Sequence, residues 1–154
     1  IKGGGYRHPS SEETLREKVV DEYGNIRSDE QGYMQGGDVF NFVIREIPRD
    51  IKKTLEYAGD TADSFDYIVF HQANNFINAY IAKKMKLDTD KIPSTIAKYG
   101  NTSSVSVPLT IVSELKDRLY GNKKLLLSAF GVGMTWATGI VPFVDCKISD
   151  IVEV

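Results

Sequence analysis

Residues Tyr67-Ile68-Val69-Phe70-His71-Gln72-Ala73-Asn74 join a short apolar run to a polar cluster. The apolar run, residues 67–70, predicts a short strand buried on both faces, because branched and aromatic residues favour strands. The apolar spacing from Asn74 to Met85 predicts a helix directly afterwards. Open α/β sheets bind ligands where a buried strand ends and the chain turns into a helix, which is the position of His71. Taken alone, a histidine that only caps this turn is the simpler interpretation.

The composition limits the class of protein and its partners. The 154 residues suffice for one domain with a core, and 19 basic against 21 acidic residues argue against nucleic acid or a membrane surface as the main partner. The sequence contains no signal peptide and no apolar run of the roughly 20 residues that span a bilayer. Cys146 is the single cysteine, which fits a reducing compartment. We therefore expect a cytoplasmic α/β chain, and we interpret its start at Ile1 as that of a piece of a longer protein.

The spacing of apolar residues, glycine and proline predicts the remaining elements. Residues 1–33 lack a period and predict an irregular surface or lid segment of the same domain. We expect a helix that stops at Pro48, and a second helix that begins there and runs to about Ala58. A later helix either starts near Ser106 or bends at Pro108. Further strands are predicted at residues 124–130 and 134–144, and an edge strand in the tail at 145–154.

Three polar loops interrupt this apolar framework, at residues 71–74, 100–103 and 131–133. A neutral imidazole, a carboxamide and the free N–H groups of a glycine-flanked turn can each donate a hydrogen bond to an oxygen that gains negative charge. The loops therefore suggest a site for an enolate or a tetrahedral oxyanion. The site lacks a nucleophile, because Cys146 follows the last long strand and is interpreted as a structural thiol, while Ser103 and Ser104 are expected to cap a helix.

The same loops carry a resemblance to a known family. HQAN at 71–74, GNTS at 100–103 and AFGVGMTW at 129–136 resemble the C-terminal half of the β-ketoacyl-acyl-carrier-protein synthase III family, as does MQGGDVFNF at 34–42. The resemblance covers roughly residues 34–143 and implies that residues 34–154 form a thiolase-like α/β domain, a mixed sheet covered by helices. It also implies an acyltransferase of fatty acid biosynthesis, which condenses acyl-CoA with a malonyl thioester by a decarboxylative Claisen reaction, without a metal or a bound cofactor.

The resemblance assigns roles to individual residues. His71 and Asn101 match the family's catalytic histidine and asparagine, and the backbone N–H of Val132 matches an oxyanion-hole position that usually belongs to a glycine. The implied substrate-binding positions are Gly36, Phe40, Ala73 and Asn74.

Two departures from the family pattern affect the surface that is expected to meet an acidic carrier protein. Phe76 replaces the arginine of the usual QANxR pattern, and Asn41 replaces a frequent lysine. Lys83 and Lys84 remain as candidate docking residues. Two interpretations of Phe76 stay open: an exposed side chain that contacts a partner, and a side chain that points into the core.

The nucleophilic cysteine belongs to the family's N-terminal half, so the resemblance implies that this chain alone is inactive. The implied partners are the N-terminal half, acyl carrier protein or coenzyme A thioesters, and a second copy in a homodimer. One alternative is a coenzyme A-dependent thiolase-like synthase of a secondary pathway. Another is a non-catalytic partner subunit that keeps the thiolase-like fold.

Overall fold

A computed structural model describes residues 2–18, 20 and 23–152 of the chain, which divides into two compact units, Ile1–Val39 and Phe40–Val154. The first unit contains one short helix, α1 (Glu12–Leu15), and an isolated bridge between Gly5 and His8. Ser11 and Thr14 form a capping box at the start of α1, since each side chain bonds the backbone N–H of the other at 3.2 and 2.8 Å. The remaining described part of this segment has no regular secondary structure.

A single long helix, α2 (Gly36–Ala58), replaces the two helices that we expect on either side of Pro48. Pro48 has no N–H to donate to the carbonyl of Ile44, four residues earlier, which is why proline usually breaks a helix. Here the Lys84 ammonium donates to that carbonyl at 2.7 Å. The prediction of a break is therefore wrong, because a residue 40 positions away supplies the missing hydrogen bond.

This contact predicts a conditional role for Lys84 in stability. Lys84→Met should lower the free energy of unfolding by about 1 kcal/mol, because the Ile44 carbonyl loses its donor. In a Pro48→Ala background the same change should have little effect, because the restored N–H of residue 48 then serves that carbonyl. Urea unfolding of the four proteins measures the coupling, with Lys83→Met as the control for loss of a neighbouring exposed lysine. Equal losses in both backgrounds would contradict this account.

The sheet is mixed, with the strand order β1-β2-β3. β1 (Tyr67–Phe70) runs parallel to β2 (Asn122–Gly131), and β2 pairs antiparallel with β3 (Thr135–Val144). The three predicted strands are confirmed. The predicted edge strand in the tail is wrong for residues 145–152, which form no strand, while residues 153 and 154 lie outside the described part. Instead, Ile148 packs against the buried core and Asp150 pairs with Lys116.

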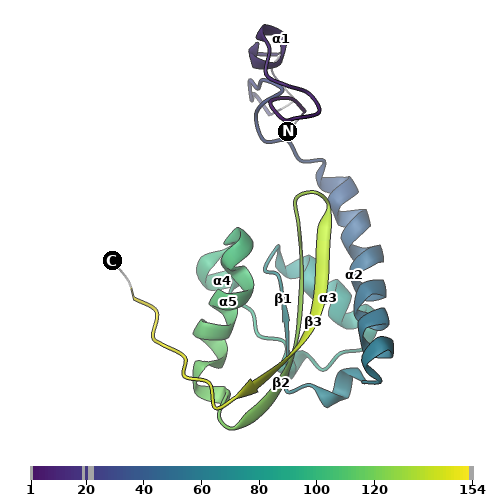
Figure 1. Cartoon of the computed structure of the whole chain (residues 1–154), viewed down its shortest axis with the longest axis vertical. Coiled ribbons are helices and arrows are strands. Elements are labelled where there is room, and N and C mark those ends of the chain that lie inside the picture. The colour runs from purple at the N-terminus through teal and green to yellow at the C-terminus, as the bar shows by residue number, and fades with distance from the viewer. Residues whose placement is uncertain (1, 19, 21–22, 153–154) are drawn as a thin grey trace. The chain divides into compact units, whose positions relative to one another are not determined.

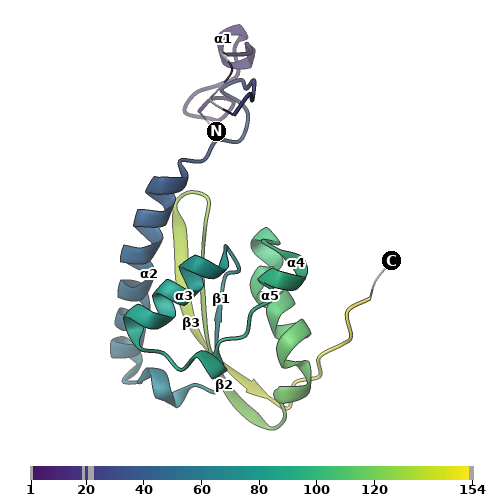
Figure 2. The same cartoon turned by 180° about the vertical axis from the view of Figure 1, so that it is seen from behind.

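Helices cover both faces of the sheet (Figures 1 and 2). α2 and α3 (Asn75–Met85) lie on one side, and α4 (Ile96–Tyr99) and α5 (Ser106–Thr110) lie on the other. α5 begins at Ser106, one of the two predicted arrangements, and continues as one π turn (Ile111–Leu115) and one 3-10 turn (Lys116–Arg118). Three further 3-10 turns are Ala62–Ser64, Thr89–Lys91 and Ser103–Val105.

Successive side chains of a strand point to opposite faces of the sheet, and this explains why the core has two layers. Val69 and Leu125 point to the α5 side, where they form one buried cluster with Ile111, Leu115 and Leu119. Their buried neighbours Ile68, Phe70 and Leu126 point to the opposite face, toward α2 and α3. Those two helices bury one apolar stripe each, formed by Val43, Ile47, Ile51 and Leu55 on α2 and by Ile77 and Ile81 on α3. The sheet therefore holds the end of β1 rigidly between two helical layers.

Candidate active site

His71 lies at the carboxyl end of β1, where the chain leaves the sheet for α3. Its backbone N–H donates to the Ser128 carbonyl on β2 at 2.8 Å. Its own carbonyl accepts from the Asn78 side chain on α3 at 3.1 Å. The backbone of His71 is thus fixed from the neighbouring strand and from the helix that follows, which gives its side chain a defined direction.

The imidazole of His71 contacts a residue beside each of the other two polar loops. Its Nδ1 lies 2.6 Å from the hydroxyl oxygen of Ser106, which follows the GNTS loop. Its ring packs edge to face against Phe130, with centroids 5.0 Å apart, directly before the turn at residues 131–133. Burial lowers the pKa of His71 below its ordinary value and so favours the neutral ring, which offers one N–H donor. The structure therefore places one residue that follows the second polar loop and one that precedes the third beside the same histidine.

Asn101 presents its amide group in a defined orientation. Its carboxamide oxygen accepts the backbone N–H of Ser103 at 2.9 Å, so the amino group is left to donate elsewhere. This contact also corrects the expected caps at Ser103 and Ser104. α5 starts at Ser106 without a side-chain cap, and the Ser103 N–H is bound by Asn101. An exposed carboxamide with its oxygen occupied is suited to donate to an oxyanion.

In the turn between β2 and β3, Gly133 and not Val132 has a positive φ angle. Gly133 has φ +146°, and a Cβ there would come within 3.0 Å of the Thr135 nitrogen. Val132 is 98% exposed, so its side chain takes no part in packing. The Val132 carbonyl accepts from the Thr135 hydroxyl at 2.9 Å. The assignment of the Val132 N–H to an oxyanion hole stays a prediction.

The four predicted substrate-binding residues differ in their surroundings. Gly36 is the first residue of α2, and Ala73 is half-buried in the turn after β1. Asn74 caps α3, because its side-chain oxygen accepts the Ile77 N–H at 2.8 Å. Phe40 is half-buried on α2. Asn74 therefore stabilises the start of α3. Contact of the four residues with substrate stays a prediction.

An aromatic patch, formed by Phe40, Phe76 and Tyr80, lies between α2 and α3. The Phe40 ring centroid is 5.7 Å from that of Phe76 and 6.4 Å from that of Tyr80. Phe76 is 68% exposed, which rules out the alternative that it points into the core. The Lys84 ammonium lies 5.7 Å from the Tyr80 ring centroid, and Lys83 is exposed. Docking of a carrier at these two lysines stays a prediction.

Sequence reasoning missed two buried polar residues that support the site. Ser106 bonds the His71 imidazole across 35 positions, and no pattern in the sequence pairs them. Gln72 donates to the Phe70 carbonyl at 2.8 Å and accepts from the Thr95 N–H at 3.0 Å and the Ser94 hydroxyl at 3.1 Å. The sequence did place Gln72 next to His71 at the end of a buried strand, which could have indicated a supporting role. Both residues tie the turn after β1 to segments that lie far away in the sequence.

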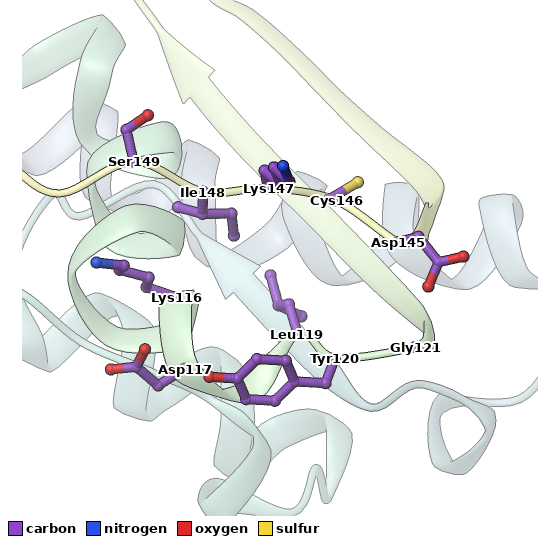
Figure 3. A pocket seen from close by; sticks show the side chains of 10 residues that line it. All are labelled: Lys116, Asp117, Leu119, Tyr120, Gly121, Asp145, Cys146, Lys147, Ile148 and Ser149. Atoms are coloured by element: carbon purple, nitrogen blue, oxygen red, sulfur yellow. The ribbon is translucent and has the colours of Figure 1, made fainter.

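Cys146 lies at the opposite end of the sheet from His71. It follows β3, whose last residue Val144 pairs with Asn122 at the start of β2, whereas His71 follows the pair formed by Phe70 and Ser128 near the other end. Its exposed side chain borders a hollow of about 540 Å³ between the C-terminal tail and the turns after α5 (Figure 3). Cys146 is therefore neither a nucleophile for this site nor a thiol buried in the core.

The described residues also bear on metal and membrane binding. Among them, no group of three or more histidine, cysteine, aspartate or glutamate side chains is placed to hold a metal ion. Across the same part of the chain, every helix is too short or too polar to cross a bilayer.

Comparisons with known proteins identify the family of this chain. The family described as 3-oxoacyl-[acyl-carrier-protein (ACP)] synthase III C terminal matches residues 55–143. The β-ketoacyl-[acyl-carrier-protein] synthase III of Streptococcus gordonii is 44% identical over 112 residues, a match that covers 70% of this chain and 34% of that protein. The chain thus spans about a third of the length of the curated relatives that it matches.

Solved structures show the same likeness. The 3-oxoacyl-(acyl-carrier protein) synthase of Burkholderia xenovorans LB400 has a TM-score of 0.73 at 42% identity, covering 77% of this chain and 34% of that one. A 3-oxoacyl-(acyl-carrier-protein) synthase III solved at 2.1 Å has a TM-score of 0.80 at 38% identity, covering 91% of this chain and 42% of that one. The chain belongs to the β-ketoacyl-[acyl-carrier-protein] synthase III family, and it has the thiolase-like fold of that family's C-terminal domain.

Proposed function

We propose that this chain is the part of a 3-oxoacyl-acyl-carrier-protein synthase III that supplies His71 and Asn101 to a condensing site in fatty acid biosynthesis. The observation that carries the proposal is the pair of oriented donors at the end of β1 and in the GNTS loop. His71 is neutral and held by Ser106, and the Asn101 oxygen is occupied by Ser103. In the proposed site, both side chains present N–H groups to an incoming oxygen.

These donors suit the decarboxylation of a malonyl thioester. When the carbon–carbon bond to the carboxylate breaks, its electron pair moves into the thioester and negative charge builds on the carbonyl oxygen. Hydrogen bonds from His71 and Asn101 stabilise that enolate oxygen more than the neutral carbonyl. The enolate carbon then attacks an acyl group carried as a thioester on a cysteine outside this chain, and the cysteine leaves as thiolate. The malonyl thioester supplies the electron pair and the acyl-cysteine accepts it, so the step needs no cofactor.

We propose acyl carrier protein as the partner that presents the malonyl group, and the cytoplasm as the location. The names of the relatives support the carrier, and the single cysteine supports a reducing compartment. Lys83 is the better candidate docking cation, because the Lys84 ammonium already donates to the Ile44 carbonyl.

The isolated chain tests the assignment of the nucleophile. Incubation with acyl-CoA and a malonyl thioester should give no ketoacyl product, because Cys146 lies at the far end of the sheet from His71. Mass spectrometry of the products decides the point. Formation of product at a rate comparable to a complete synthase would overturn the placement of the nucleophile outside these residues.

Exposure of Phe76 makes it a suitable position for testing carrier docking. In the complete enzyme, Phe76→Arg should raise the affinity for acidic carrier protein about two- to fivefold, since an exposed ion pair contributes at most about 1 kcal/mol. The gain should shrink as salt is added. Titration of carrier at two salt concentrations measures both effects.

Tyr57→Arg is the matched control, because it adds the same charge at an exposed aromatic residue near the far end of α2. An equal gain in both variants would show non-specific attraction of an acidic partner. A folded Phe76→Arg variant with unchanged affinity would contradict docking at the aromatic patch.

A further inference from the structure

We propose that Ser106 is a positioning residue that keeps the proton of neutral His71 on Nε2, so that the ring donates in the direction away from α5. The purpose of this arrangement rests on the proposed function, because a condensing site needs His71 as a donor. The arrangement itself follows from hydrogen bonds in this chain.

Ser106 is held in place before it meets the histidine. It is 1% exposed at the first position of α5, and its carbonyl accepts from the Thr110 hydroxyl at 2.8 Å. Its hydroxyl oxygen lies 2.6 Å from Nδ1 of His71 and accepts the backbone N–H of Gln72 at 3.3 Å. One buried hydroxyl thus meets two consecutive residues at the end of β1.

Counting hydrogens and lone pairs shows whether Ser106 or His71 is the donor in the hydrogen bond between them. A serine hydroxyl has one hydrogen and two lone pairs, and the Gln72 N–H occupies one lone pair. If Nδ1 carried the ring proton, it would occupy the second lone pair and leave the hydroxyl hydrogen buried without an acceptor, which costs about 1–3 kcal/mol. Among the hydrogen bonds of the described residues, Nδ1 is the only acceptor that this hydroxyl meets. The hydroxyl therefore donates to Nδ1, and the proton of the neutral ring lies on Nε2.

The surroundings of the ring fit a donor rather than a base. Burial is the only cause that shifts the pKa of His71 within the described part of the chain, and no carboxylate raises it. The perpendicular ring of Phe130 packs against the imidazole and opposes its rotation. Ser106 thus takes the position that a carboxylate occupies beside a histidine that acts as a base, and a hydroxyl adds no charge there.

Nuclear magnetic resonance of the whole chain, labelled with nitrogen-15 in histidine, tests the proposal without any substrate. The chain has two histidines, and His8→Gln assigns the remaining signals to His71. Above about pH 7, Nδ1 of His71 should resonate as an unprotonated ring nitrogen and Nε2 as a protonated one. A proton on Nδ1 in the unaltered protein would overturn the proposal.

Variants of the hydroxyl show whether Ser106 is the cause. Ser106→Ala should reduce the excess of the Nε2–H form about two- to tenfold, the usual range for loss of one hydrogen bond. Ser106→Thr should keep it, and Ser104→Ala, which removes an exposed hydroxyl of the 3-10 turn before α5, should leave it unchanged. A folded Ser106→Ala variant with the original proton distribution would refute the role of Ser106. If that variant does not fold, the threonine variant and the unaltered protein still decide the direction of the bond. None of these results depends on whether the protein condenses thioesters.

Discussion

Alanine in place of His71 or Asn101 is expected to slow the release of carbon dioxide from a malonyl thioester about 100- to 1,000-fold in the complete enzyme. Each change removes one N–H donor from the oxygen that becomes negative during decarboxylation. Acylation of the cysteine should stay partly intact, because it takes place before the enolate forms. Release of labelled carbon dioxide and mass spectrometry of the acyl-enzyme measure the two steps separately.

His8→Ala provides the control for the loss of a histidine, since His8 is exposed and belongs to the Ile1–Val39 unit. If the His71 and Asn101 variants both released carbon dioxide at nearly the parental rate, their assignment as oxyanion donors would be wrong. Loss of acylation together with decarboxylation would point to a disrupted fold.

Gln72→Ala is expected to lower the free energy of unfolding of the chain by about 2–4 kcal/mol, a large effect for one polar residue. The Gln72 side chain is 0% exposed and makes three hydrogen bonds, to Phe70, Ser94 and Thr95. Its removal leaves the buried Thr95 N–H without its acceptor and opens a cavity beside the site. Urea unfolding of the chain measures the loss.

Gln35→Ala removes the same side chain from an exposed position and should change the free energy of unfolding by less than about 0.5 kcal/mol. A Gln72→Ala loss as small as this control would show that the network around Gln72 does not hold the turn after β1. Gln72→Glu should also destabilise the protein, because it replaces the donor to the Phe70 carbonyl with a buried carboxylate oxygen.

Local patterns were sufficient to predict the strands and the helix after His71. Residues 67–70 are aromatic or branched, Leu125 to Leu127 form an apolar run in the second strand, and Asn74 is a good cap, so local preference and burial agree at those positions. The predicted break at Pro48 failed because the compensating donor, Lys84, comes from another helix. The prediction for the tail failed in a similar way, since Ile148 packs against the core cluster instead of extending the sheet.

The candidate site shows the same division between local and distant causes. Its donors, His71 and Asn101, stand in loops whose polarity and position mark them in the sequence. Ser106, which orients His71, is an ordinary serine at a helix start until the fold brings it beside the ring. Exposure of Phe76 also depends on packing, because Phe40 on α2 covers only one side of its ring. Side chains that act through another residue need the three-dimensional structure.

The central claim is that these residues supply donors to a condensing site whose nucleophile lies elsewhere. The most direct test replaces the matching region of the Streptococcus gordonii relative, 44% identical over 112 residues, with the corresponding residues of this chain. Condensation of acyl-CoA with malonyl-acyl carrier protein is then measured. We predict ketoacyl product from the chimera, none from the isolated chain, and a loss of about 100-fold or more when His71→Ala is added. A folded chimera that forms no product, or one that keeps full activity with His71→Ala, would contradict the claim.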